Sequence, residues 1–551
     1  MGIKLGNGKW ATKEDELLAY RVIEGKYFDR SFDFARSSTT TRVNKDGYIE
    51  DVPSDTARID FADSVDGALV TESASTNLIT YPKSFSSSYW TKNGASVVGD
   101  SSTAGSELVT NGTFDTDASS WVDDSGANLD WQSDSTLLVG NGGGDNTYAA
   151  AQSNVLVSGK TYKVSFRFKP SGLGTLRVRL GGSGTTFTTE SFVVDAWNEV
   201  ELFGTADNTT LEIGSVGGNI TNFYLDNVSV KEVQGFDAPR VDGSGYLEKE
   251  AYKLVEDSQN SGHFLGISDL NVSNTATVTR SVYAKQGERN EFMILETNNS
   301  ANCWFDLESG IVGTEYNASG KIEALSNGWY RCSMTSTVDA TYSLMRIYLG
   351  SGSENSSYQG DGTSGIYIAY AQLEEQASAT SLMLPVTEGS TTSRVADACN
   401  GSGTAQDFKD YNASGTLYAE IAANSDDLTS RYISLSDGTA SNRLFFYYTS
   451  TTNRIKAKVV VSDATVSSFS SDLSDITEFS KIGIRYAEND FSLWVDGVEV
   501  DTDTSGSVFS ANTLTELAFD AGSGGSDFYG KTRALEVLPY MSDEEMETLT
   551  T

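Results

Sequence analysis

Apolar and polar residues alternate with a period of two along much of this chain. In residues 161–170 every second side chain is apolar and the intervening ones are mostly cationic. Successive side chains of a strand point to opposite faces of a sheet, so this segment predicts a half-buried strand. The apolar positions are Tyr162, Val164, Phe166 and Phe168. Shorter runs of the same alternation predict strands around Val178, Ala457 and Ile484.

Helical signals are few. Residues 12–20 predict one or two helical turns, and the segment Ser542-Asp-Glu-Glu is a capping box that predicts a short C-terminal helix. Residues 491–500 predict a β-hairpin, because Asp496-Gly497 supplies the positive φ angles that a tight primed turn requires.

The chain contains an internal repeat in an unusual order. Two similar openings, at residues 77–90 and 107–121, precede two similar bodies at 161–232 and 277–375. The simplest arrangement is nesting, in which the second opening and the first body form a module inserted into a loop of the other. Exposed loops whose ends lie close together tolerate such insertions. The alternative is a strand that crosses between the modules.

Nesting predicts five parts. They are an N-terminal attachment or capping segment (1–76), a discontinuous domain (77–105 plus 236–397), an inserted module (106–235), a small polar linker (398–405) and a C-terminal domain (406–551).

Composition supports an all-β protein of several domains. The 551 residues include 26 Tyr, 25 Phe and 8 Trp, enough to build cores, and 52 Gly against 6 Pro, so turns rest on Gly, Asn, Asp and Ser.

The net charge of −37 argues against binding nucleic acid or an anionic bilayer. Its simplest role is a solubilising coat, and a specific acidic role such as calcium binding is the alternative. We expect no secretory signal and no membrane insertion, because neither an apolar leader nor a run of ~20 apolar residues is present.

Several segments resemble appendage proteins of bacteriophage heads and tails. They cover most of residues 30–105 and 236–397, and the main ones are Phe34-Ala-Arg-Ser-Ser-Thr, Val43-Asn-Lys-Asp-Gly-Tyr-Ile, Arg58-Ile-Asp-Phe, Ala74-Ser-Thr-Asn-Leu-Ile-Thr-Tyr, Asn327-Gly-Trp-Tyr-Arg, Ala371-Gln-Leu-Glu-Glu and Glu388-Gly-Ser-Thr-Thr-Ser-Arg. Residues 106–235 are similar to jelly-roll carbohydrate-binding modules. Residues 404–551 are similar to concanavalin A-like, laminin-G-type domains.

These resemblances imply several β-sandwich jelly rolls, one inserted into another, with a concanavalin A-like sandwich and a short helix at the C-terminus. They also imply a structural virion protein, such as a tail fibre, that is assembled in the host cytoplasm and exposed on the particle. Its expected partners are other virion proteins, host cell-surface glycans and its own copies, with a trimer favoured. The alternative is a head-fibre, capsid or neck decoration with a purely structural role.

The sequence predicts no enzymatic activity. His263 is the one histidine, so a metal site with several histidines is excluded and a nucleophile–histidine system would have to use it; we expect it to be packed in a strand or on the surface. The three cysteines form no metal-ligand spacing and are expected to be free thiols. A glycosidase with two carboxylates remains the enzymatic alternative, because acids are plentiful.

Candidate glycan-binding residues are aromatic. Trp131 and Tyr148 lie in a Gly/Asp/Asn-rich region where rings could stack on sugars, and Trp494 flanks the predicted hairpin turn. Core packing is the expected role of the remaining tryptophans considered, namely Trp90, Trp121, Trp197 and Trp329. The resemblance to sugar-binding modules further implies a structural calcium held by Asp115 and Asp226, with backbone carbonyls supplying most other ligands.

Overall fold

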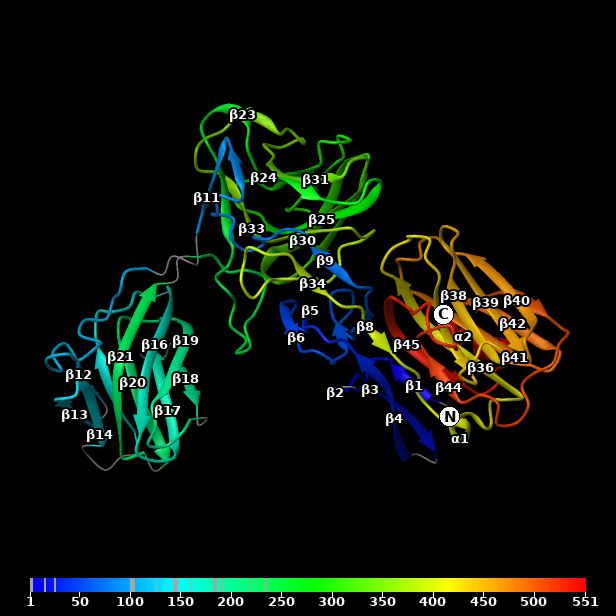
Figure 1. The fold of residues 1–551 in the computed structure, drawn as a ribbon, viewed down its shortest axis with the longest axis horizontal. Coiled ribbons are helices and arrows are strands. Elements are labelled where there is room, and N and C mark those ends of the chain that lie inside the picture. Colours follow the sequence, from blue (N-terminus) through cyan, green and yellow to red (C-terminus); the bar gives the residue numbers. More distant parts are fainter. Residues whose placement is uncertain are drawn as a thin grey trace. The chain divides into compact units, whose positions relative to one another are not determined.

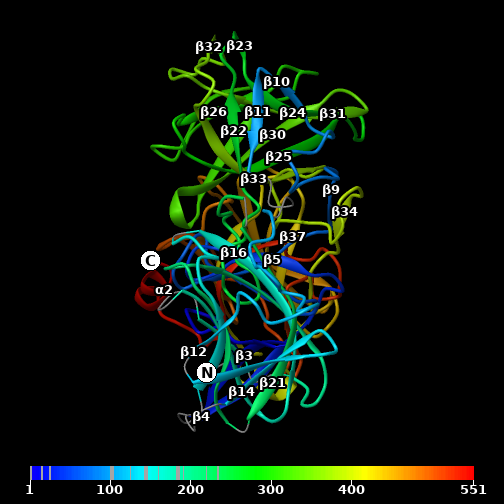
Figure 2. The same ribbon diagram turned by 90° about the vertical axis from the view of Figure 1, so that its left-hand side faces the viewer.

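The structure, a computed structural model, is built almost wholly of β-strands (Figures 1 and 2). It describes residues 3–13, 16–23, 26–99, 105–124, 126–141, 147–158, 160–181, 186–189, 192–218, 220–232 and 235–551. The chain forms two compact units. One comprises Met1–Val98, Pro239–Gly243 and Lys253–Thr551, and the other comprises Gly99–Ala238 and Ser244–Tyr252. No helix among the described residues is long and apolar enough to cross a membrane.

The C-terminal sandwich has two sheets that enclose one hydrophobic core. The larger sheet contains β1 (Ile3–Gly6), β2 (Thr12–Lys13), β3 (Glu16–Ile23), β4 (Lys26–Ala35), β7 (Arg58–Asp60), β8 (Ala68–Thr71), β35 (Ala398–Cys399), β36 (Ser414–Ala423), β41 (Ser480–Ala487), β42 (Asp490–Val495), β43 (Val498–Asp503) and β45 (Gly530–Leu538). The smaller sheet contains β37 (Arg431–Ser436), β38 (Arg443–Tyr448), β39 (Arg454–Val461), β40 (Ala464–Asp472) and β44 (Glu516–Ala518). The helices are α1 (Ala405–Phe408) and α2 (Asp543–Thr550).

The N-terminal segment differs from expectation. Strand β1 pairs with β45, and Ile3, Leu17 and Phe32 join the C-terminal core. The segment 12–20 was predicted as helical turns, and this is wrong for its described residues: 12–13 form β2 and 16–20 are part of β3. Strands β1 and β4 lie on either side of β3 and take up its backbone hydrogen bonds. Residues 14 and 15 lie outside the described residues. Residues 398–405, predicted as a linker, are instead part of the C-terminal sandwich, because β35 pairs with β4 and Ser402 forms a β-bridge with Leu517.

A second sandwich is discontinuous in sequence. One sheet contains β10 (Thr91–Asn93), β24 (Phe264–Asn271), β31 (Tyr342–Leu349), β26 (Glu291–Leu295), β27 (Asn302–Asp306) and β28 (Ile311–Tyr316). The other contains β11 (Ala95–Val98), β22 (Tyr252–Glu256), β33 (Gly365–Glu374), β25 (Ala276–Lys285), β30 (Trp329–Val338), which follows the 3-10 turn η1 (Ser326–Gly328), and β29 (Ser319–Ala324). Three two-stranded ladders accompany them: β5 (Thr40–Val43) with β6 (Ile49–Val52), β9 (Ser75–Asn77) with β34 (Thr392–Arg394), and β23 (Asn260–Gly262) with β32 (Ser357–Gln359).

The inserted module has two five-stranded sheets around its own core. They contain β12 (Val122–Asp124), β15 (Thr147–Gln152), β20 (Leu211–Gly218), β17 (Gly174–Leu180) and β18 (Thr186–Thr189) in one, and β13 (Ala127–Gln132), β14 (Thr136–Asn141), β21 (Asn222–Glu232), β16 (Thr161–Pro170) and β19 (Asn198–Thr205) in the other. Strands β10 and β11, which follow the first opening and belong to the predicted segment 77–105, pair with β24 and β22 and not with this module. That is the pairing that nesting predicts.

The sequence repeat has a structural counterpart. In the inserted module β16 lies between β19 and β21, and in the discontinuous sandwich β25 lies between β30 and β33. Each central strand has a register shift against one neighbour. The indole N–H groups of Trp90 and Trp121 both donate to carbonyls of their own openings, those of Tyr81 and Asn111, at 3.0 Å. Both rings are buried, as predicted.

Two local predictions are confirmed. Strands β42 and β43 form the expected hairpin, with positive φ at Asp496 and Gly497. Ser542 caps α2 through a reciprocal capping box with Glu545. Helix α2 then packs on the outer face of the larger C-terminal sheet, across β41, β42 and β43.

A buried ion network ties the N-terminal segment to the end of the discontinuous sandwich. Arg36, Arg58 and Arg394 are each 1% exposed and surround the carboxylates of Glu72 and Asp397. Arg58 Nη1 lies 2.5 Å from Glu72, its Nη2 pairs with Asp397, and Arg36 Nη1 lies 3.1 Å from Asp397. Arg394 Nη2 lies 3.3 Å from Glu72. Backbone amides complete the shell, since the N–H of Glu72 donates to Asp397 and that of Asp397 to the Glu72 carbonyl.

The network shifts the ionisation of its members. Burial alone would raise the pKa of the Glu72 carboxyl, but Arg58 and Arg394 outweigh it and lower that pKa to about 2. For Arg58, burial lowers the pKa of the guanidinium, but the attraction of Asp397 and Glu72 raises it by more. The net effect is a raised pKa. The charged forms of Glu72 and Arg58 are therefore stabilised by their partners in the network.

Removing the central arginine should destabilise the protein strongly. Arg58→Met leaves two buried carboxylates with too few cations, and breaking a buried ion pair in this way costs about 3–5 kcal/mol. Urea unfolding followed by tryptophan fluorescence measures the loss. The matched variant Arg454→Met, which removes a surface pair with Asp472, should leave the transition in place. An unchanged midpoint for Arg58→Met would contradict the structural role of the network.

Stability should fall in acid through Glu72. The pKa of Glu72 in the folded protein, about 2, lies below its unfolded value of about 4.3. Its contribution to the free energy of unfolding is therefore complete above the unfolded value. The contribution is lost as the pH falls from about 4.5 toward 2. Glu72→Gln should flatten this part of a stability–pH profile, whereas the exposed Asp501→Asn should leave it as in the wild type. Parallel profiles for the wild type and Glu72→Gln would argue against this assignment.

Candidate functional site

The inserted module presents an open face on the sheet that contains β21, β16 and β19, which lie side by side (Figure 1). The inward side chains of β16, Tyr162, Val164, Phe166 and Phe168, are buried as predicted. The outward ones, which include Arg167 and Lys169, keep part of their surface exposed. The alternation of β16 therefore creates both the core and the open face.

Cross-strand pairing gathers polar and aromatic side chains on this face. Arg167 is paired with Asp226 on β21 and with Glu199 on β19. One step along, Lys169 is paired with Tyr224. Residues directly opposite one another in a sheet share a face and lie within contact distance. We call Arg167, Lys169, Trp197, Tyr224 and Asp226 the outer-face strip.

Trp197 is the most exposed ring of the strip. It was predicted to be core, and this prediction is wrong, because 39% of its surface is exposed. Asn198, the next residue, pairs with the inward-facing Phe168, so Trp197 falls on the opposite, outer face. The Arg167 guanidinium carbon lies 4.6 Å from the Trp197 ring centroid. This contact is in cation–π range and holds the ring against the sheet.

Asp226 fixes the guanidinium in turn. Arg167 donates to Asp226 Oδ2 from Nε at 2.9 Å and from Nη2 at 2.5 Å, and Asp226 Oδ1 accepts the N–H of Asn227 at 2.7 Å. Tyr224 lies on β21, the same strand as Asp226, and its ring centroid is 6.0 Å from Lys169 Nζ. The strip thus has two rings held by cations, with hydrogen-bonding groups between them.

Trp131 lies at a different place in the same sheet. It is 37% exposed on the edge strand β13, and its indole N–H donates to the Phe114 carbonyl at 2.7 Å. Its register partner Leu137 is buried core, so Trp131 lies at the rim on the core side of the sheet. Four strand spacings of about 4.8 Å, roughly 19 Å, separate β13 from β19. One sugar ring therefore cannot contact both Trp131 and Trp197.

The other predicted aromatic positions do not join either site. The side chain of Tyr148 lies outside the described residues, although its backbone belongs to β15. Trp494 was predicted as a platform, but it is only 5% exposed. Its outward position on β42 is the face that α2 covers, and its indole N–H donates to Ser492 at 3.0 Å. A covered ring has no face for a sugar.

The two predicted calcium ligands, Asp115 and Asp226, each have a hydrogen-bond partner within the protein, and the calcium site stays a prediction. The Asp226 carboxylate is engaged by Arg167, and Asp115 accepts a hydrogen bond from Thr113 at 2.9 Å. Across the described part of the chain, no group of three or more His, Cys, Asp and Glu side chains could hold a metal ion.

The remaining chemical candidates are buried, except Cys399, which is half-buried. His263 is fully buried, with Nε2 3.2 Å from the Tyr358 carbonyl and Nδ1 3.3 Å from Asp257. Cys303, Cys332 and Cys399 are free thiols, as expected. Burial raises the pKa of Cys303 to about 12, so this thiol is a poor nucleophile.

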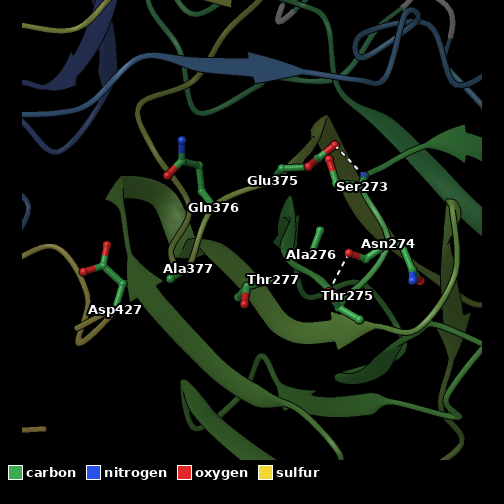
Figure 3. Close-up of a pocket in the computed structure, with 9 residues that line it drawn as sticks. All are labelled: Ser273, Asn274, Thr275, Ala276, Thr277, Glu375, Gln376, Ala377 and Asp427. Carbon is green, nitrogen blue, oxygen red and sulfur yellow. Dashed lines mark hydrogen bonds between the residues drawn. The ribbon is translucent and has the colours of Figure 1, made fainter. Parts of the chain in front are cut away.

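A polar hollow of about 320 Å³ lies beside β25 and the end of β33 (Figure 3). The Ser273 amide donates to Glu375 at 3.0 Å within it, and Asp427 approaches from the C-terminal sandwich. No aromatic side chain lines the hollow. It therefore lacks the stacking surface that the outer-face strip has.

No protein-family model and no curated protein matches the chain. Among solved structures, the tandem CBM22 domain from Paenibacillus barcinonensis Xyn10C is 16% identical, covering 49% of this chain and 97% of that one at a TM-score of 0.23. Mouse laminin α1 domains LG4-5 are 13% identical, covering 51% and 88% at a TM-score of 0.19. At such scores these likenesses carry no argument, and the β-sandwich architecture rests on the sheets described above.

Trypanosoma rangeli sialidase in complex with sialic acid is also similar. It is 12% identical and covers 99% of this chain and 98% of its own at a TM-score of 0.22. The prediction that the chain is not an enzyme is contradicted by this match and is withdrawn. The identity and TM-score are too low to transfer an activity.

Proposed function

We propose that this chain is a surface protein of a bacteriophage virion that binds glycans of the host cell, and that the outer-face strip is a contact site. The observation that carries the proposal is the pair of partly exposed rings, Trp197 and Tyr224, on either side of Arg167 and Lys169. The segments of residues 30–105 and 236–397 that resemble phage appendage proteins support a location on the particle exterior.

The chemistry of the strip suits a sugar. Aromatic rings pack against the apolar C–H faces of a pyranose, while charged and polar side chains beside them bind its hydroxyl groups. Because Arg167 is held by both Asp226 and Trp197, little side-chain freedom is lost on binding.

Affinity at one strip should be weak, since an open sheet face buries little area. A trimer, or several copies on one virion, would raise the overall affinity by orders of magnitude without new contacts. Multivalency of this kind matches attachment to a cell surface, where the same sugar unit is repeated many times. The other expected partners are the virion proteins to which the chain would be fixed.

Removing both rings should weaken glycan binding while the fold is kept. We expect Trp197→Ala/Tyr224→Ala in the full-length chain to bind at least about tenfold more weakly, or about 1.4 kcal/mol, because both stacking surfaces are lost. Affinity electrophoresis against purified bacterial surface polysaccharides measures the change. Trp131→Ala, tested in parallel, separates the rim of the sheet from its outer face.

The matched control removes two exposed tyrosines from the discontinuous sandwich, Tyr316→Ala/Tyr342→Ala, which are 55% and 46% exposed. It should bind like the wild type. If no polysaccharide retards the wild-type chain, or if the control loses as much affinity as the strip variant, the proposal fails and a structural decoration role is favoured.

A further inference from the structure

The C-terminal sandwich has two outer faces, one on each sheet, and they differ in what covers them. Helix α2 packs across β41, β42 and β43 and covers the outer face of the larger sheet there. On the smaller sheet, Ile433, Phe446 and Ala457 point into the core, so the alternating residues point outward. These outward residues include three aromatic and three cationic side chains, which we call the aromatic–lysine face: Tyr432, Arg443, Phe445, Tyr447, Lys456 and Lys458.

Register places five of these side chains in two neighbouring rows, and Arg443 lies in the row after them, opposite Val460. Tyr432 on β37 is paired with Tyr447 on β38, which is paired with Lys456 on β39. In the next row, Phe445 on β38 is paired with Lys458 on β39. The two lysines are two residues apart on one strand, so their Cα atoms are separated by about 6.7 Å. Tyr432, Tyr447 and both lysines keep part of their surface exposed.

The rings form a rigid platform. The Tyr432 and Tyr447 rings stack with centroids 4.4 Å apart and an interplanar angle of 3°. Phe445 lies 5.6 Å from each of them, and the Arg443 guanidinium carbon is 4.6 Å from the Phe445 ring centroid. Because these side chains already hold one another, a ligand that packs on them immobilises little more.

The charge of the face is opposite to that of the chain. The protein carries a net charge of −37, yet Lys456 and Lys458 have no hydrogen-bond or ion-pair partner among the residues that the structure describes. Their cross-strand neighbours on β40 are Ser470 and Ser468, which are neutral. The nearest acid of that edge, Asp472, is held by Arg454 at 2.6 Å. Half-buried lysine side chains whose ammonium groups have no counter-charge in the protein favour an anionic ligand.

We propose that the aromatic–lysine face binds an anionic polysaccharide, whose sugar rings pack beside the tyrosines while its carboxylate or sulfate groups pair with Lys456 and Lys458. Screening over about 8–10 Å at physiological salt confines the attraction to this face despite the acidic remainder of the chain. This site is in a different sandwich from the outer-face strip, so either can fail without the other.

The test uses the full-length chain and four probes: polygalacturonate for carboxylates, heparin for sulfates, dextran as a neutral polymer and a single-stranded DNA oligonucleotide. We expect binding to polygalacturonate or heparin and none to dextran, and we expect binding to weaken as salt rises from about 50 to 200 mM. Which of the two anionic polymers binds more tightly identifies the anionic group.

Charge removal at the face should weaken that binding. Lys456→Gln/Lys458→Gln should bind about tenfold more weakly, the loss expected for two partly exposed ion pairs. Lys456→Arg/Lys458→Arg should retain most of the affinity. The matched control Lys409→Gln/Lys481→Gln, which removes two lysines elsewhere in the same sandwich, should bind like the wild type.

Three outcomes would overturn the proposal. The first is a wild-type chain that binds neither anionic polysaccharide at low salt. The second is an equal loss of affinity in the control and in the Lys456/Lys458 variant. The third is tighter binding to the oligonucleotide than to either polysaccharide, which would assign the face to single-stranded nucleic acid.

Discussion

The larger unit depends on a buried network of three arginines and two carboxylates. Arg36, Arg58 and Arg394 come from segments far apart in the chain and meet at Glu72 and Asp397. A buried charge is costly unless it is paired, so each partner enforces the position of the others. The network fixes the N-terminal segment against the end of the discontinuous sandwich. Each of the three arginines lies in one of the short motifs Phe34-Ala-Arg-Ser-Ser-Thr, Arg58-Ile-Asp-Phe and Glu388-Gly-Ser-Thr-Thr-Ser-Arg, which gives those motifs a physical role in the fold.

The inserted module depends on a second constraint, the closeness of its two ends. Val98, the last residue of β11, is paired with Lys253 on β22. A chain that leaves one strand and returns on its neighbour can carry a whole sandwich between them without breaking the ladder. The module keeps its own core and the same central three-strand arrangement as its host. It can therefore display the outer-face strip while the host sandwich remains intact.

Sequence patterns predicted what local physics decides and missed what distant residues decide. The strand at 161–170, the hairpin around Asp496-Gly497 and the capping box at Ser542 follow from neighbouring residues alone. Residues 16–20 lie in a strand because β1 and β4 flank β3, which no local signal reveals. Trp494 is covered by α2, which packs on its strand. Trp197 is exposed because its neighbour Asn198 pairs with the inward-facing Phe168. The meeting of Arg36, Arg58 and Arg394 around Glu72 and Asp397 could not be predicted from local patterns, because their segments are far apart in the chain.

The most direct test of sugar recognition is a crystal structure of the full-length chain with an oligosaccharide released from a bacterial surface polysaccharide that it binds. The account predicts sugar rings packed against Trp197 and Tyr224, with hydroxyl groups bonded to Arg167 or Lys169. A sugar bound elsewhere in the inserted module, with Trp197 and Tyr224 still facing solvent, would contradict it.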